Sequence, residues 1–222
     1  MNLLAIDTSS ENVSLAVMWK DRVVVDFNRK MRFGASKVIV CIDAYIRKLS
    51  VNLEKIDAFI IGRGPGSFTG LRISFSIVKA LNVALGKPVI SIGSFLTCAL
   101  PFRKKEKIAV ISDARRKLIY AASFKANRDT LRLEGKEKLM SLEEFVQKKR
   151  NYFFVSYDNA LREQSLARFP DIDFFQKDVY PNAKSLLLLA QDYFCNNIFT
   201  PLDKLEPLYI YPKTCQIRRK NV

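Results

Sequence analysis

Residues 56–85 of this 222-residue chain read I-D-A-F-I-I-G-R-G-P-G-S-F-T-G-L-R-I-S-F-S-I-V-K-A-L-N-V-A-L. Residues 56–61 form a short apolar run of the kind that makes a buried strand. The loop 62–70 that follows holds four of the eight glycines of the chain. Apolar residues then recur at helical spacing until Gly86-Lys87-Pro88 ends the helix. A strand, a glycine loop and a helix in this order predict an α/β protein.

Outward from this unit, the N-terminal sequence predicts a strand hairpin. An apolar run over 3–6 ends in the polar turn Asp7-Thr8-Ser9-Ser10-Glu11-Asn12, and a strand pattern resumes over 13–19. The same order recurs over 108–124, where Asp113 takes the place of Asp7, so the chain contains a weak internal repeat. The other predicted elements are strands over 22–28, 89–92 and 152–156 and helices over about 36–49, 94–100, 141–149, 159–168 and 183–194.

Mixed strands and helices in this order indicate two lobes with central mixed sheets. We place the boundary before the basic linker, so that residues 1–102 form an N-terminal lobe with the glycine loop and residues 103–222 a C-terminal lobe. No apolar run approaches the length that crosses a membrane, and the N-terminus does not resemble a signal peptide. We therefore expect a cytoplasmic location and no membrane contact.

The composition excludes several kinds of catalytic site. The chain has no histidine, which removes Ser-His-Asp and Cys-His hydrolases and histidine-ligated metals for the chain acting alone. The four cysteines, Cys41, Cys98, Cys195 and Cys215, form no C-x-x-C pair. Neither a catalytic site that uses an imidazole nor a site for a transition metal is therefore expected.

A strong positive charge is the other compositional feature. Lys and Arg number 37 against 22 Asp and Glu, which gives a net charge of +15. Basic clusters occur at 103–105, 115–117, 148–150 and 218–220. Each cluster is either a solvated surface or a contact for phosphate. Charge alone allows an RNA-binding module, which would show a steep salt dependence of RNA affinity.

The glycine loop does not match two known sequence motifs of phosphate-binding loops. A Walker A loop ends in Gly-Lys-Ser/Thr, whereas Gly70 is followed by Leu71 and Arg72. The dinucleotide pattern G-x-G-x-x-G started at Gly64 meets Thr69 at its sixth position. The loop is then either structural, with tight turns and a helix cap, or an anion site built from backbone amides.

Both long helices of the N-terminal half have more apolar residues than one packed face needs. The helix after the glycine loop carries a second stripe beside its Leu71-Phe75-Val78 stripe, and Ile39, Val40 and Ala44 lie off the main stripe of the earlier helix. Such helices are either buried on all sides or covered by a partner. The candidate partner-contact residues are Val38, Ile39, Ile42, Ile73, Ile77, Ala80 and Ala84.

Four motifs together resemble the bacterial TsaB (YeaZ) family. They are Ala5-Ile6-Asp7-Thr8-Ser9, the string G-R-G-P-G-S-F-T-G-L-R-I over 62–73, Asp113-Ala114-Arg115-Arg116, and Glu206-Pro207-Leu208-Tyr209. The resemblance covers nearly the full length. It implies a two-lobed actin/Hsp70-like (ASKHA, ribonuclease H-like) fold and a role in making the threonylcarbamoyl modification of the adenosine beside the tRNA anticodon.

The resemblance also implies partners. TsaB proteins are non-catalytic paralogues that pair with the enzyme TsaD, with the ATPase TsaE as a third component, and they form homodimers when TsaD is absent. Contact with tRNA is expected through the complex. The catalytic paralogue carries an H-x-x-x-H metal pair, and the matching positions here, Ser94 and Cys98, cannot rebuild it.

No cofactor is required on this interpretation, although ATP or ADP at the partner interface is allowed. The candidate nucleotide-binding residues are Asp7, Thr8, Ser9, Gly64, Gly66 and Ser67. An alternative from the enzyme class is a nucleotide-dependent ASKHA transferase or phosphatase that acts alone through Asp7, with Asp113 as a second carboxylate around a magnesium-bound phosphate.

Overall fold

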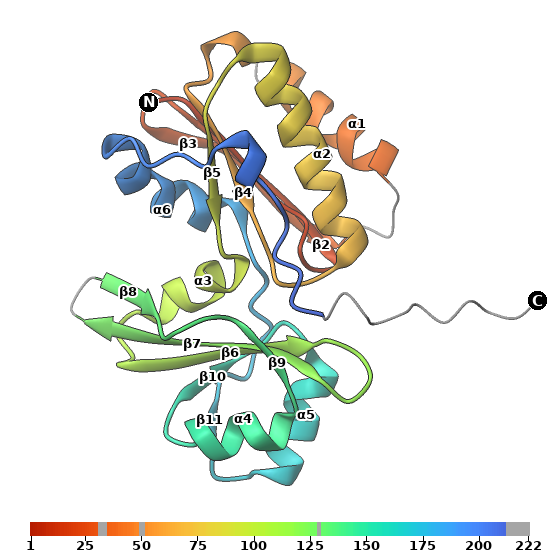
Figure 1. The fold of residues 1–222 in the computed structure, drawn as a ribbon, viewed down its shortest axis with the longest axis vertical. Coiled ribbons are helices and arrows are strands. Elements are labelled where there is room, and N and C mark those ends of the chain that lie inside the picture. Colours follow the sequence, from red (N-terminus) through yellow and green to blue (C-terminus); the bar gives the residue numbers. More distant parts are fainter. Residues whose placement is uncertain (31–34, 49–51, 128–129, 212–222) are drawn as a thin grey trace, which may run out of the picture.

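Two mixed sheets, one above the other in Figure 1, form the centres of two lobes. The computed structural model describes residues 1–30, 35–48, 52–127 and 130–211. The first part of the chain contains β1 (Leu3–Asp7), β2 (Asn12–Trp19), β3 (Arg22–Lys30), α1 (Ala35–Lys48), β4 (Ala58–Gly62), α2 (Phe68–Leu85), β5 (Val89–Ile92) and α3 (Ser94–Ala99). The second part contains β6 (Lys107–Asp113), β7 (Ile119–Asn127), β8 (Thr130–Leu133), β9 (Lys138–Met140), α4 (Leu142–Lys149), β10 (Phe153–Val155), α5 (Asn159–Arg168), β11 (Asp173–Phe174) and α6 (Ala183–Cys195). Short 3-10 turns lie at Leu53–Lys55, Leu100–Phe102 and Leu202–Lys204.

The two sheets repeat one topology. The first has the strand order β3-β2-β1-β4-β5, and the second has the order β11-β10-β6-β7-β8 with β9 beside β7. In each sheet the first strand pairs antiparallel with the second and parallel with a later strand, as β1 does with β2 and β4 and as β6 does with β7 and β10. The predicted fold class, an α/β protein of two lobes with mixed sheets, is confirmed.

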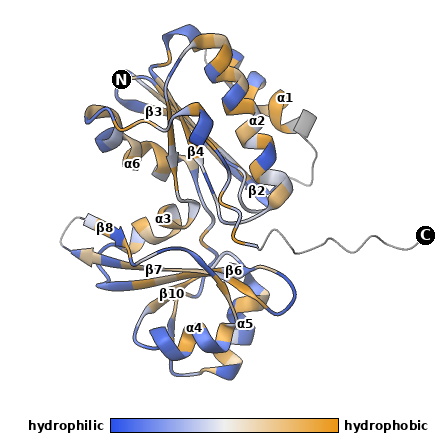
Figure 2. Ribbon diagram, viewed as in Figure 1, coloured by the Kyte–Doolittle hydropathy of each residue, from blue (hydrophilic) through white to orange (hydrophobic). Residues whose placement is uncertain are grey.

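Side chains of the first sheet point alternately to its two faces and contribute to two separate hydrophobic cores. Leu4 and Ile6 of β1 face α1 and α2, where they pack with Phe75 and Val78 of α2. Leu3 and Ala5 point to the opposite face and pack against α6. Because successive side chains of a strand alternate between its faces, one short apolar strand serves both layers. The hydropathy colouring in Figure 2 shows hydrophobic residues along these central strands.

Two helices each pack on the sheet that the other half of the sequence forms. α6, near the C-terminal end of the described chain, packs on β1, β2 and β4 of the first sheet, with Leu186 and Leu187 fully buried. α3, which belongs to the N-terminal half, packs on β6, β7 and β8 of the second sheet through Phe95 and Cys98. The predicted lobes 1–102 and 103–222 therefore misplace both helices. An apolar helix face shows that it is buried, but not which sheet buries it.

α2 is the longest helix and has well-defined ends. Ser67 caps its N-terminus by accepting a hydrogen bond from Gly70 N at 3.2 Å, and Gly86 at φ 65° ends it in the left-handed conformation. By length and composition α2 could cross a membrane, which differs from the expectation that no apolar run reaches that length. Because Leu71, Phe75 and Val78 belong to the core of the first lobe, we assign α2 to the globular fold.

The sequence did not predict three strands of the second sheet. β8, β9 and β11 are two to four residues long and partly exposed, so they carry no usable apolar period. The last residue of the helix predicted over 36–49, together with Cys215 and the basic cluster 218–220, lies outside the described residues.

Truncation of Leu187 tests the assignment of α6 to the first lobe. Leu187 is fully buried against the first sheet, whereas Leu188 on the same helix is 49% exposed. We expect Leu187→Ala to lower the free energy of unfolding by about 2–5 kcal/mol, the usual cost of a large-to-small core change. Leu188→Ala is the matched control and should change it by less than about 0.5 kcal/mol. Equal effects in urea unfolding would contradict the assignment.

Candidate functional site

The turn between β1 and β2 is held by hydrogen bonds between its own residues. Asp7, the last residue of β1, accepts hydrogen bonds at Oδ1 from the Ser9 backbone N at 2.8 Å and from Ser9 Oγ at 2.6 Å. The exposed fractions of Asp7, Thr8 and Ser9 are 1%, 2% and 1%. Three of the four polar residues that the sequence proposes for nucleotide contact are therefore buried, whereas Ser67 is exposed.

The glycine loop covers this turn. Ser67 N donates to Ser9 O at 2.6 Å, and Thr8 Oγ1 donates to Gly70 O at 2.6 Å. A Cβ atom at Gly66 would lie 2.0 Å from Ser9 O, and one at Gly70 would lie 1.9 Å from Thr8 O. Only glycine allows the loop backbone to approach so closely. The glycines are thus required by a backbone contact within the chain.

Several of the loop amides that could face an anion already have partners. Gly64 N donates to Ser94 Oγ at 3.0 Å, and Gly70 N donates to the capping Ser67 Oγ. Actin-like folds imply a nucleotide whose phosphates are held by the turns after the first strands. The residues proposed for the nucleotide come together, but Asp7, Thr8 and Ser9 are buried and held by internal hydrogen bonds, so this turn does not face a phosphate as folded here.

Asp7 also has an unusual electrostatic position. Burial raises the pKa of its carboxyl, an effect that hydrogen bonds from Ser9 partly oppose. Its Oδ2 atom has no hydrogen-bond partner among the described residues. Burial, with the Asp7 charge as a second cause, raises the pKa of the Cys98 thiol well above its ordinary value. Asp7 and Cys98 are both buried, and a thiol whose pKa is raised by burial is unreactive, which fits a structural role for Cys98.

Ser94 and Cys98, the positions matched to the metal pair of the catalytic paralogue, lie on α3 and are fully buried. Thiolate, not thiol, is the metal-binding form of cysteine, and the raised pKa of Cys98 keeps it protonated at neutral pH. Within the described ranges, no three His, Cys, Asp or Glu side chains gather as a group that could hold a metal ion.

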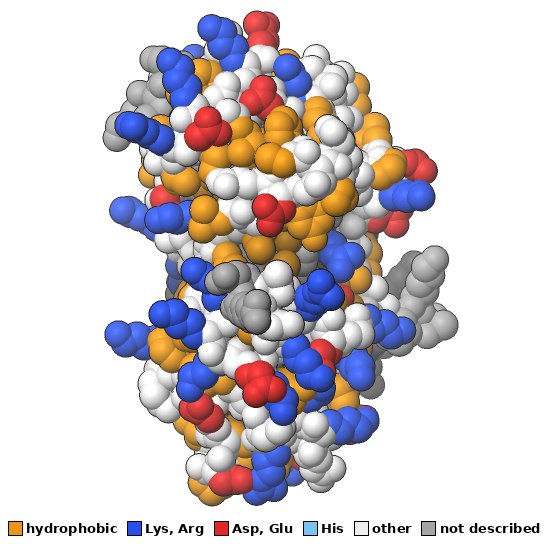
Figure 3. Space-filling model, turned by 90° about the vertical axis from the view of Figure 1, so that its left-hand side faces the viewer, with side chains coloured by type: hydrophobic (Ala, Val, Ile, Leu, Met, Phe, Trp, Pro, Cys, Tyr) orange, Lys and Arg blue, Asp and Glu red, His pale blue; other side chains and the backbone are white. Residues whose placement is uncertain are grey.

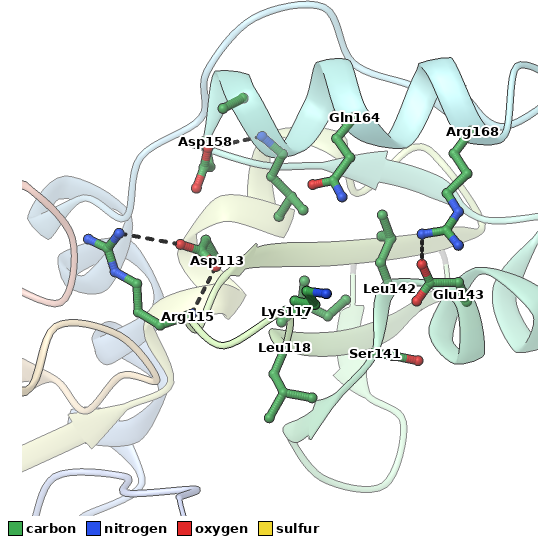
Figure 4. Close-up of a pocket in the computed structure, with 13 residues that line it drawn as sticks. Asp113, Arg115, Lys117, Leu118, Ser141, Leu142, Glu143, Asp158, Gln164 and Arg168 are labelled. Atoms are coloured by element: carbon green, nitrogen blue, oxygen red, sulfur yellow. Dashed lines mark hydrogen bonds and ion pairs between the residues drawn. The ribbon is translucent and has the colours of Figure 1, made fainter. Parts of the chain in front are cut away.

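The equivalent turn of the second lobe is open. Asp113 ends β6 and accepts a hydrogen bond from Arg115 N at 2.8 Å, the same local geometry as Asp7 with Ser9. It lines a cavity of about 970 Å³ between the β6–β7 turn and helices α4 and α5 (Figure 4). Arg115 pairs with Asp113, and Arg168 pairs with Glu143 across this cavity. Asp7 does not line it, so the two carboxylates of the enzyme alternative do not meet in this cavity.

The C-terminal segment joins the lobes, which the sequence did not reveal. Leu208 N donates to Arg63 O at 2.8 Å in the glycine loop. Three residues later, Tyr211 Oη donates to Ala114 O in the β6–β7 turn. The buried Glu137 accepts a hydrogen bond from Arg63 at 3.2 Å and forms a second link between the lobes. We call residues 205–211 the C-terminal strap.

The candidate partner-contact residues divide by burial. Val38 and Ile42 belong to the first core, 2% and 6% exposed, so their assignment to a contact surface is corrected. Ile73 and Ile77 are half-buried against the same core. Ile39, Ala80 and Ala84 are exposed, and Val40 and Val83 beside them are 66% and 74% exposed. We define the α1–α2 surface as the exposed residues Ile39, Val40, Ala80, Val83 and Ala84.

Two lobes of one repeated topology, each with a polar turn after its first strand, define a protein of the actin-like (ASKHA, ribonuclease H-like) class. The family model described as TsaD, tRNA N6-adenosine threonylcarbamoyltransferase, matches residues 32–196, well over half of the chain. The chain belongs to this family and, within it, to the TsaB (YeaZ) proteins. The resemblance that the four motifs indicate is thereby confirmed.

The relatives carry this assignment over most of the chain. The TsaB protein of Haemophilus influenzae is 27% identical over 95% of this chain and 93% of its own length. The TsaB protein of Escherichia coli is 32% identical over 58% of this chain and 57% of its own length. The solved structure of YeaZ from Pseudomonas aeruginosa is 25% identical, covers 94% of this chain and all of that one, and has a TM-score of 0.76.

A pH titration of stability tests the burial of Asp7. A carboxyl whose pKa is raised on folding stabilises the fold while it is protonated, and that stabilisation is lost as the pH rises through the raised value. We expect the free energy of unfolding to fall above about pH 4 by up to about 1.4 kcal/mol per pH unit. Asp7→Asn should remove this component. An identical pH profile in the variant would contradict a raised pKa at Asp7.

Proposed function

We propose that this chain is a non-catalytic, cytoplasmic subunit that pairs with a TsaD-type paralogue and works with a TsaE-type ATPase. The shared task is the threonylcarbamoylation of the tRNA adenosine beside the anticodon. The names of the relatives, tRNA threonylcarbamoyladenosine biosynthesis protein TsaB, and the family match support this pathway. The observation that carries the pairing role is the α1–α2 surface.

The α1–α2 surface has the character of a contact for another protein. α1 and α2 contact each other on the outer side of the first lobe. Ile39, Val40 and Val83 expose 52%, 66% and 74% of their surface. Apolar residues gathered on neighbouring helices are typically covered by a partner. An exposed apolar surface of this kind also favours a homodimer of this chain when the paralogue is absent.

The non-catalytic role is supported by the residues at the centre of the fold. The chain lacks histidine, and the positions matched to the metal pair hold a buried serine and a buried neutral thiol. The Asp7 turn is filled by the glycine loop. Binding of ATP or ADP at the partner interface stays a prediction.

A charge placed on α2 tests the pairing surface. Val83→Glu would bury an unpaired carboxylate in the contact, which costs several kcal/mol. We expect the Kd for the TsaD-type paralogue, measured by calorimetry, to rise about a hundredfold or more. Val24→Glu is the matched control, because Val24 is 44% exposed but lies on β3. Unchanged pairing of the Val83 variant would remove α2 from the interface, provided that its thermal unfolding equals that of the wild type.

An assay of the chain alone tests the non-catalytic role. Incubated with threonylcarbamoyl-AMP and tRNA, the purified chain should form no threonylcarbamoyladenosine, and product should appear once the TsaD-type paralogue is added. Mass spectrometry of the digested tRNA measures both. Product formed by the chain with the paralogue rigorously excluded would overturn the proposal.

A further inference from the structure

An exposed cluster of two aromatic rings and an arginine lies at the start of α2. The ring centroids of Phe68 and Tyr209 are 5.1 Å apart, and each residue is 47% exposed. The Arg72 guanidinium lies 3.9 Å from the centroid of the Phe68 ring and donates from Nε to Tyr209 Oη at 3.3 Å. We call Phe68, Arg72 and Tyr209 the stacking platform. It joins the glycine loop region to the C-terminal strap.

A basic turn lies beside the platform along the strap. Tyr211, two residues after Tyr209, donates its hydroxyl to Ala114 O at the start of the β6–β7 turn. The next residues, Arg115, Arg116 and Lys117, all have positive φ, at 69°, 53° and 61°. Two residues of chain span at most about 7 Å. The strap therefore contacts the platform at Tyr209 and the basic turn at Tyr211, two residues apart, at the junction of the lobes.

Net charge alone does not locate a binding surface on this molecule. Figure 3 shows Lys and Arg side chains spread over both lobes, with acidic side chains among them. In the cluster 148–150, for example, the basic residues pair with Glu144, Glu134 and Asp171. The basic turn differs because exposed aromatic rings adjoin it. Arg72 and Lys117 form no ion pair with the described residues, so their positive charges are available to a ligand.

The combination of features selects a nucleic acid over a protein partner. Unpaired bases stack on aromatic rings and on guanidinium planes, whereas phosphates are held by neighbouring Lys and Arg. Phe, Tyr and Arg also occur at protein interfaces, so the basic turn beside the platform, which suits phosphates, is the feature that favours a nucleic acid. The net charge of +15 favours an anionic ligand in the same way.

We propose that the stacking platform and the basic turn 115–117 bind a single-stranded stretch of RNA directly. One unpaired base stacks on the exposed part of this platform, and the adjoining phosphates contact the basic turn. The choice of a tRNA loop as that RNA rests on the proposed function. The chain then holds the RNA substrate itself as well as its protein partner.

Binding of RNA to the full chain tests the proposal. The probes are a synthetic RNA hairpin with an unpaired loop and a duplex of the same stem without the loop, followed by fluorescence anisotropy. We expect the hairpin to bind more tightly than the duplex. Phe68→Ala should weaken hairpin binding about tenfold, as expected for one lost base-stacking contact, and Phe68→Trp should retain it. Equal binding of both probes, or an unchanged Phe68→Ala variant, would overturn the proposal.

Control variants separate stacking, charge and folding. Tyr193→Ala removes an exposed aromatic residue of α6 and should leave hairpin binding unchanged. Lys117→Gln should reduce the slope of log affinity against log salt by about 0.7, the value for one phosphate contact with a single strand. Lys20→Gln is its matched control, since Lys20 is an exposed basic turn residue with φ 49°. An unchanged salt slope in Lys117→Gln would overturn the role of the basic turn. If Phe68→Ala does not fold, Tyr209→Ala gives the same measurement.

The same variants distinguish this proposal from the proposed function. Phe68→Ala should pair with the TsaD-type paralogue as the wild type does, because the platform lies outside the α1–α2 surface. Loss of pairing in this variant would reassign the platform to the protein interface and overturn the RNA contact. If the wild type binds hairpin and duplex equally while pairing persists, this proposal alone fails. If loop-selective RNA binding persists without any pairing, the proposed function alone fails.

Discussion

The fold depends on the exchange of two helices between its halves. Each sheet has one face covered by helices from its own half, α1 and α2 on the first and α4 and α5 on the second. The other face of each sheet is covered by a helix from the other half, α6 on the first and α3 on the second. α3 and α6 also contact each other. Because a sheet with an uncovered apolar face is unstable in water, neither lobe is complete without the other half of the sequence.

This exchange fixes the position of the glycine loop and of everything attached to it. β4 leads into the loop, and α3 places Ser94 where its hydroxyl accepts the hydrogen bond from Gly64 N. In the first lobe the loop then closes on the Asp7 turn, whereas the equivalent Asp113 turn of the second lobe stays open to solvent. Two turns with the same local hydrogen bond thus have different environments, and the glycine loop covers only the first of them. Of the two equivalent turns in the duplicated fold, the Asp7 turn is buried and the Asp113 turn is accessible to solvent.

Strands and helices with long apolar runs could be predicted from the sequence. The strand predicted over 56–61 is β4 (Ala58–Gly62), and the helix predicted over 159–168 is α5 (Asn159–Arg168). The burial of Asp7 and Thr8 could not be predicted, because it depends on contacts such as that of Thr8 with Gly70, which is 62 positions away in the chain. Polar residues in a hairpin turn usually face solvent.

The sequence indicated which residues belong to the functional regions, but not how those residues are arranged in space. The four motifs indicated the family, and the surplus apolar residues of the two long helices indicated a surface. Val38 and Ile42 were assigned to that surface because helical spacing defines a stripe without its direction; only packing with Phe59 and Val78 shows that they face inward. The strap could not be recognised either, since its role lies in single hydrogen bonds to Arg63 and Ala114.

The place of α6 in the sequence has a consequence for the synthesis of the protein on the ribosome. The first sheet is translated early, but Leu3, Ala5 and Ile60 on its inner face gain their cover only when residues 183–195 have emerged. Domains of many proteins fold one after another as they leave the ribosome. Here the N-terminal lobe must wait for almost the whole chain. Until then its apolar face stays open to chaperones and to aggregation, so a message cut short before Ala183 would yield a fragment that cannot bury that face.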